Sequence, residues 1–259
     1  MIRLTCNHEG LMAEQWCAAP TVYLDHWAWR KISESQKLSS RFCHSLKSSG
    51  GTLAFSWLNL IEWSAVTDPR QAKRSSNLLD VALPNAFLLY PNFFKVIETE
   101  DTLIAGGAPN APPADMVTSD WFVKEGLRAR GSVKPFDAGD LFGLVQACGM
   151  RAKFNDFANL VVKELRRLKK HRNGQSTLST FFRAPKGQPV LRGTRFLARE
   201  LIGCFLRDKP VKLDRNNAID LCHAVVAAAY CDYALLDRGW EDRSYRRRTV
   251  FAKQECISP

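Results

Sequence analysis

The chain has 259 residues, of which 46% are hydrophobic and 24% charged, and its net charge is +11. These values are typical of a globular protein and exclude wholesale disorder, collagen and low-complexity repeats. The longest unbroken apolar run, Ala224 to Cys231, is far shorter than the roughly 20 residues of a membrane-spanning helix, so we expect no membrane segment.

In the N-terminal half, short apolar runs alternate with helical patterns. Strands are predicted over Val22 to Leu24, which ends at Asp25, and over Thr52 to Trp57. Helices are predicted over His26 to Ser33, Gln36 to Ser48, Asn59 to Thr67 and Arg70 to Leu83. Residues 105–114 are rich in Gly and Pro and predict a loop.

The C-terminal half is mainly helical in pattern. Helices are predicted over Asp137 to Cys148, Phe154 to Lys170, Thr194 to Arg207, Asn216 to Ala229 and Arg238 to Arg248. We expect the asparagines at 216 and 217 to cap their helix, which would place Asp220 near its first turn. A last strand, Tyr233 to Leu236, ends at Asp237. Strands alternating with helices predict an α/β fold with a parallel sheet.

The first residues and the cysteines predict the cellular compartment of the protein. Residues 1–16 lack the apolar core of a signal peptide and contain Glu9 and Glu14, which predicts a cytoplasmic protein. Its eight cysteines should then be reduced. The group Cys6, His8 and Cys17 matches no common zinc spacing, so we expect free thiols rather than a zinc site.

The positive charge is concentrated in one part of the chain. Residues 151–215 carry 17 Lys and Arg against 5 Asp and Glu, whereas residues 216–237 carry three Asp and no basic residue. A cluster of Lys and Arg indicates a polyanionic partner, although a basic helix alone is more often a solvated face. The best candidates for a surface that guides such a partner are Lys163, Arg166, Arg167, Lys169 and Lys170.

Four acidic residues are candidates for one site. Asp25 and Asp237 each follow a strand, and ligands of parallel sheets bind beyond the carboxyl ends of the strands. Glu62 stands in an apolar helix, either at its solvent-exposed edge or paired in a site.

Asp220 lies one turn before His223, for which we expect packing and a satisfied hydrogen bond. Asp232 is an odd number of residues from Asp237, so the two should point to opposite faces.

Together, Asp25, Glu62, Asp220 and Asp237 can form a carboxylate cage. Hard oxygen donors select Mg²⁺ or Mn²⁺ rather than zinc, and such ions activate water for phosphodiester cleavage. The sequence has no phosphate-binding Gly-rich loop, no GxGxxG after a strand, no GxSxG and no HExxH, so nucleotide hydrolysis, dinucleotide redox chemistry and serine hydrolysis have no support.

Three segments resemble the PIN-domain nucleases, a family that includes the toxin ribonucleases of bacterial toxin–antitoxin pairs. They are VYLDHWAW (22–29), FSWLNLIEWSAV (55–66) and NNAIDLCHAVVAAAYCDYALLDRGW (216–240). The resemblance implies a three-layer α/β/α sandwich with a central parallel sheet and metal-dependent cleavage of single-stranded RNA. Asp25, Glu62, Asp220 and Asp237 match the family's acidic positions.

The resemblance also implies a single PIN-like domain over residues 20–259, with a largely helical, basic insertion at about 100–212 and an N-terminal extension over 1–19.

The sequence therefore predicts an Mg²⁺- or Mn²⁺-dependent endoribonuclease, with His26 or His223 as weaker candidates for contact with the scissile phosphate. A toxin role would bring an antitoxin partner over the acidic site, and self-association into a homodimer is left open. Three alternatives remain: a non-catalytic nucleic-acid-binding protein on the same fold, a structure-specific DNA nuclease, and an α/β protein whose acids are turn residues.

Overall fold

The computed structural model describes residues 1–7, 10–109, 112–118, 137–170, 193–207 and 213–237. Its centre is a four-stranded sheet in the order β5-β4-β3-β6, in which every neighbouring pair is parallel. The strands are β3 (Thr21–Leu24), β4 (Thr52–Ser56), β5 (Ala86–Leu89) and β6 (Tyr233–Leu235). This confirms the predicted α/β class with a parallel sheet.

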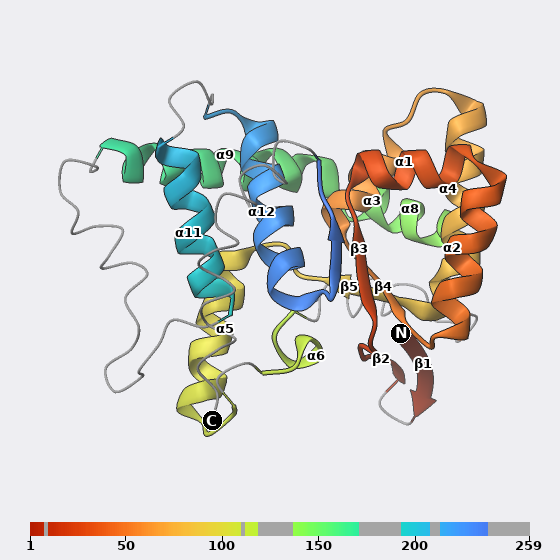
Figure 1. The fold of residues 1–259 in the computed structure, drawn as a ribbon, viewed down its shortest axis with the longest axis horizontal. Coiled ribbons are helices and arrows are strands. Elements are labelled where there is room, and N and C mark those ends of the chain that lie inside the picture. The colour runs from red at the N-terminus through yellow and green to blue at the C-terminus, as the bar shows by residue number, and fades with distance from the viewer. Residues whose placement is uncertain (8–9, 110–111, 119–136, 171–192, 208–212, 238–259) are drawn as a thin grey trace.

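Helices flank the sheet (Figure 1). On one side of the view lie α1 (His26–Glu34), α2 (Gln36–Ser48) and α4 (Pro69–Ala82), with α3 (Trp57–Ser64) and α8 (Ala138–Ala147) beside them. On the other side lie α5 (Phe93–Ala105), α11 (Thr194–Arg207) and α12 (Arg215–Tyr230), and α12 also packs against α9 (Met150–Lys170). None of the described helices is both long and apolar enough to cross a membrane.

The hydrophobic core is centred on β4. All five residues of β4 are buried, and Leu53, Ala54 and Phe55 have no exposed surface. A strand covered on both faces is expected to be largely apolar, and the three central residues of β4 are, whereas the buried Thr52 and Ser56 at its ends are polar. The edge strand β6 is less buried than β4, because its Tyr233 is 60% exposed.

The N-terminal residues form two strands that the sequence analysis did not predict. β1 (Ile2–Asn7) and β2 (Gly10–Gln15) pair antiparallel in a separate two-stranded sheet. The Gln15 side chain accepts a hydrogen bond of 2.8 Å from the backbone N–H of Leu88. It thereby satisfies a backbone group on the outer edge of β5, where an open edge would otherwise invite pairing with another chain.

Between residues 100 and 212, the regular structure of the described residues is helical. It comprises the second half of α5, the short α6 (Ala114–Val117), α8, α9 and α11. A largely helical segment was predicted here. The helix predicted over 238–248 lies outside the described residues.

The predicted boundaries of α3 and α12 are wrong, and the helix predicted to Thr67 ends at Ser64. Trp57 begins α3 instead of ending β4, because Asn59 accepts a 2.8 Å hydrogen bond from the backbone N–H of Ser56 and so closes the start of the helix. The cap of α12 is Asp214, not the asparagines at 216 and 217: its side chain accepts from the N–H of Asn217 at 3.0 Å. Asp220 therefore lies in the second turn of α12.

Candidate active site

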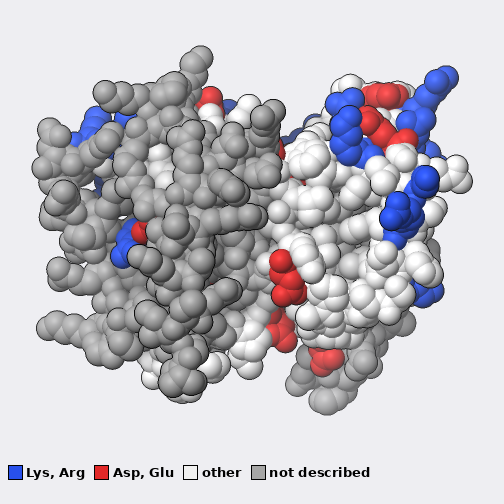
Figure 2. Space-filling model, viewed as in Figure 1, with Lys and Arg blue, Asp and Glu red and all other residues white. Residues whose placement is uncertain are grey.

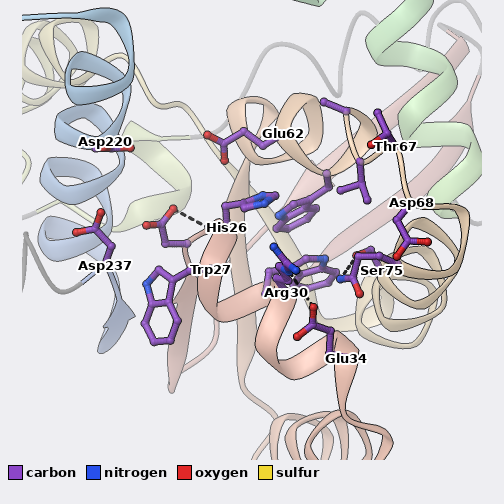
Figure 3. A pocket seen from close by; sticks show the side chains of 16 residues that line it. His26, Trp27, Arg30, Glu34, Glu62, Thr67, Asp68, Ser75, Asp220 and Asp237 are labelled. Atoms are coloured by element: carbon purple, nitrogen blue, oxygen red, sulfur yellow. Dashed lines mark hydrogen bonds and ion pairs between the residues drawn. The ribbon is translucent and has the colours of Figure 1, made fainter.

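A pocket of about 670 Å³, here called the acidic pocket, is lined by all four predicted carboxylates: Asp25, Glu62, Asp220 and Asp237. Asp25 directly follows β3, Asp237 lies two residues beyond β6, Glu62 is in α3 and Asp220 is in α12. Figure 3 shows the carboxylate of Glu62 pointing toward the side of the pocket where Asp220 and Asp237 lie. The fold therefore gathers acids from both ends of the chain at the carboxyl edge of the sheet, where ligands of parallel sheets bind.

Asp25 is held in place by its backbone and by its side chain. Its N–H donates to the carbonyl oxygen of Leu235 at 3.0 Å, which continues the pairing of β3 with β6. Its carboxylate caps α1 by accepting from the N–H of His26 at 2.7 Å. Burial raises the pKa of Asp25, and the charge of Asp237 raises it further, against the lowering effect of the His26 hydrogen bond.

Glu62 is the least compensated of the four acids. Its Oε2 atom is buried and has no hydrogen-bond partner among the described residues. Burial raises the pKa of Glu62 to about 8, with further contributions from the charges of Asp25 and Asp220. A carboxyl group buried beside other carboxylates is expected to respond in this way, because its charged form is disfavoured twice. A bound cation would offset both effects by stabilising the charged form.

The acidic pocket suits a hard divalent cation because its donors are carboxylate oxygens. They do not by themselves form a complete ligand cage. Among the described residues, no three His, Cys, Asp or Glu side chains stand close enough together to hold one ion directly. Mg²⁺ often keeps several waters and takes only one or two carboxylates as direct ligands. The unpartnered Glu62 oxygen and the neighbouring Asp25, Asp220 and Asp237 provide carboxylates for such a partly hydrated ion.

The remaining walls of the acidic pocket combine aromatic and paired charged groups. Trp29 and Trp63 stack with ring centroids 4.1 Å apart and form a rigid inner wall. Arg30 pairs with Glu34 at 2.8 Å, and the charged residues over this end of the molecule are of both signs (Figure 2). Trp27 is 42% exposed and presents its indole at the rim, on the side of Asp237 (Figure 3).

The two histidines considered in the sequence analysis differ in position. His26 lines the acidic pocket and its Nδ1 atom is buried without a partner among the described residues. Burial lowers the pKa of His26, while the charge of Asp25 raises it. His223 is buried and its Nδ1 bonds the hydroxyl of Tyr23, so the expectation of packing and hydrogen bonding is confirmed. Burial lowers the pKa of His223 to about 3, which leaves it neutral at pH 7.

Asp232 and Asp237 serve different places, as their spacing predicted. Asp232 accepts hydrogen bonds from the backbone N–H and the hydroxyl of Thr21, at 2.7 and 2.9 Å. It fixes the start of β3 to the turn before β6, and only Asp237 lines the acidic pocket.

A second pocket, of about 650 Å³, lies between α9 and the start of α12 and is here called the basic pocket. Its charged lining residues are Lys163, Arg166, Arg167, Lys170, Arg215 and Asp214. Four of the five predicted RNA-guiding residues line it, and Lys169 does not. The five basic residues outnumber Asp214, whose carboxylate also caps α12. The described lining of the pocket is therefore strongly positive.

Arg215 is a candidate that sequence reasoning missed. It donates to Asn159 at 2.8 Å and so fastens the start of α12 to α9. Its position in the basic stretch 151–215 was a signal, but the packing of α12 on α9 was needed to place it beside Lys163. Arg215 and Asp220 are five residues apart on one helix, about 7.5 Å along its axis. One helix therefore contributes to both pockets.

Comparison with known proteins adds no relative. No protein-family model matches the chain, and neither the curated proteins nor the solved structures contain a significant match.

Proposed function

We propose that this protein is a metal-dependent nuclease with a PIN-like fold, and that it hydrolyses phosphodiester bonds of single-stranded RNA. The observation that carries the proposal is the acidic pocket, which four carboxylates line and where the buried Oε2 of Glu62 has no partner among the described residues. Such an arrangement is costly unless a cation compensates it. The order of sheet strands and acid-bearing helices is compatible with the resemblance that the sequence shows.

A divalent cation, when bound, would neutralise the carboxylates and lower the pKa of water for attack on phosphorus. Asp25, Glu62, Asp220 and Asp237 would hold it. In the reaction, a water oxygen bonds to phosphorus, one P–O ester bond breaks, and the leaving oxygen gains a proton. The chain positions the strand by binding its phosphates in the basic pocket, which begins on the same helix as Asp220.

Two observations support an unpaired nucleic-acid strand as substrate. Trp27 offers an exposed aromatic face at the rim of the acidic pocket, and nucleobases of single strands stack on such faces. The basic pocket is lined by Arg and Lys, which suits a phosphate backbone. The choice of RNA over DNA follows from the family resemblance, as does the extension of the proposal to a toxin whose antitoxin covers the acidic pocket.

The test is a cleavage assay with labelled single-stranded RNA, single-stranded DNA and duplexes, in Mn²⁺, Mg²⁺ or EDTA. The wild-type chain should cut single-stranded RNA only with metal, and Asp25→Asn should abolish the cut while keeping the fold. Asp156→Asn, an exposed acid outside the acidic pocket, is the matched control. Cleavage by Asp25→Asn with unchanged metal dependence would contradict the site, and cleavage of DNA alone would redirect the proposal to a DNA nuclease.

A second candidate function is a non-catalytic nucleic-acid-binding protein. The observation that favours it is that no three of the described His, Cys, Asp or Glu side chains are placed to hold one ion. It predicts tight, salt-sensitive RNA binding by wild type and Asp25→Asn alike, and no cleavage by either.

A further inference from the structure

A buried hydrogen-bond network joins three distant parts of the chain that also carry acids of the acidic pocket. The hydroxyl of Tyr23 donates to Asn59 Oδ1 at 3.0 Å and also bonds His223 Nδ1. Asn59 Oδ1 additionally accepts from Ser56, from its N–H at 2.8 Å and its hydroxyl at 3.1 Å. Tyr23, Asn59 and His223 are all buried.

Tyr23, Asn59 and His223 each lie two or three residues from one of the acids. Tyr23 in β3 is two residues before Asp25, whose N–H continues the pairing of β3 with β6, and residues two apart on a strand share a face. Asn59 is three residues before Glu62 in α3, and His223 is three residues after Asp220 in α12. Residues three apart on a helix are neighbours on one face. The three bonded side chains thus join the three elements directly beside three of the four acids.

The protonation states are consistent with this arrangement. Burial raises the pKa of Tyr23 well above its usual value, as do the charges of Asp25 and Glu62, so the hydroxyl keeps its hydrogen. That hydrogen goes to Asn59 Oδ1, and the Tyr23 oxygen can then accept from His223 Nδ1. Neutral His223 has one N–H, which this bond uses, and its Nε2 remains an acceptor.

The network is not optimised for stability alone. Asn59 Nδ2 and His223 Nε2 are buried without a partner among the described residues. Buried polar atoms left without a partner destabilise a fold, whereas apolar side chains of the same shape would avoid that cost. Their presence next to the acids indicates a role in placing them.

We propose that Tyr23, Asn59 and His223 are positioning residues, which hold β3, α3 and α12 together so that Asp25, Glu62 and Asp220 line one pocket and can share one partly hydrated cation. This inference rests on the proposed function. Outer-shell partners of metal ligands act in this way, and their loss weakens metal affinity or activity by about 10- to 100-fold.

The first test compares Tyr23→Phe with Tyr233→Phe, which removes the same hydroxyl from a side chain on β6 that is 60% exposed. Tyr23→Phe should weaken Mn²⁺ binding, measured by calorimetry, and lower kcat by about 10- to 100-fold with little change in the KM for RNA. Tyr233→Phe should change neither. A Tyr23→Phe variant that melts at a lower temperature but binds Mn²⁺ and turns over like wild type would overturn the inference.

A second pair of variants guards against a change that merely unfolds the chain. His223→Asn keeps a donor close to the position of Nδ1, and His223→Leu removes it. We expect His223→Asn to retain more Mn²⁺ affinity than His223→Leu, and equal losses in both would overturn the inference. A wild-type chain that neither binds Mn²⁺ nor cleaves RNA would overturn the proposed function and this inference together, whereas an active wild type with unaffected variants overturns the inference alone.

Discussion

The acidic pocket and the basic pocket differ in how their charged side chains are compensated. In the basic pocket, Arg166 donates to the carbonyl oxygen of Leu213 at 3.2 Å, and Arg167 pairs with Glu164 at 2.9 Å. In the acidic pocket, Glu62 has a buried oxygen without a partner among the described residues, and its pKa is raised to about 8. Two arginines of the basic pocket therefore have partners within the chain, whereas the buried oxygen of Glu62 in the acidic pocket suits a positive group from outside the chain.

Helix α12 connects the two pockets. Arg215 at its first position lines the basic pocket, and Asp220 in its second turn lines the acidic pocket. A nucleic-acid strand bound through its phosphates to the first would pass close to the second. Variants that affect one pocket and spare the other therefore separate binding of the strand from its cleavage.

The largest expected effect is on cleavage through the acidic pocket. Asp220→Asn should lower the cleavage rate by at least about 100-fold, because stabilisation of transition-state charge by a metal is worth several kcal/mol. RNA affinity in EDTA should stay the same, since the basic pocket is intact. The two quantities are measured by gel assay and by fluorescence anisotropy, with Asp156→Asn as control. A loss of affinity equal to the loss of rate would show that the two pockets do not act separately.

A smaller effect is expected from the aromatic rim. Trp27→Ala should raise the KM for single-stranded RNA about tenfold, because stacking of a base on an aromatic ring contributes about 1 to 3 kcal/mol. Trp27→Phe should restore most of the affinity. Equal KM values for wild type and Trp27→Ala would remove Trp27 from the substrate path.

The basic pocket should affect binding in a way that depends on salt. Lys163→Gln combined with Lys170→Gln should weaken RNA binding several-fold at low salt and reduce the slope of log affinity against log salt by about 1.4, since each contact to a single strand contributes about 0.7. Mn²⁺ affinity should not change. The control is Lys37→Gln with Lys47→Gln in α2, which removes the same charge elsewhere. An unchanged slope in the first pair would contradict the role of this pocket.

A last effect, on folding rather than on RNA, is on thermal stability as a function of pH. The folded-state pKa of Glu62 is raised from 4.5 to about 8, so the folded chain binds the proton more tightly than the unfolded chain. In EDTA, the contribution of Glu62 to stability is therefore lost as pH rises from about 4.5 through about 8. We expect the melting temperature of Glu62→Gln to fall less across this interval than that of wild type. Parallel melting curves would contradict the buried, uncompensated state of Glu62.

Much of this arrangement was predictable from local pattern. The strand ending at Asp25 and the helix over Gln36 to Ser48 follow from apolar runs, periodicity and capping residues, and the structure confirms them. The presence of Asp25 and Asp237 at one sheet edge followed from parallel topology. These features depend on neighbours in sequence or on general rules of sheets.

Other features depend on contacts between distant residues, which the sequence pattern does not encode. The network of Tyr23 and His223 joins positions 200 residues apart, and Arg215 enters the basic pocket only because α12 packs on α9. The cap of α12 was misplaced because Asp and Asn cap equally well, so composition did not distinguish Asp214 from the asparagines that follow. The strands β1 and β2 were missed because no short turn signature marks their connection.

The most direct measurement of the central claim is Mn²⁺ binding by calorimetry to the wild-type chain and to four single variants, Asp25→Asn, Glu62→Gln, Asp220→Asn and Asp237→Asn. If the four carboxylates serve one cation, each variant should weaken binding more than about tenfold, while Asp156→Asn binds like wild type. Wild-type affinity in all four variants would contradict the claim that the acidic pocket is a metal site.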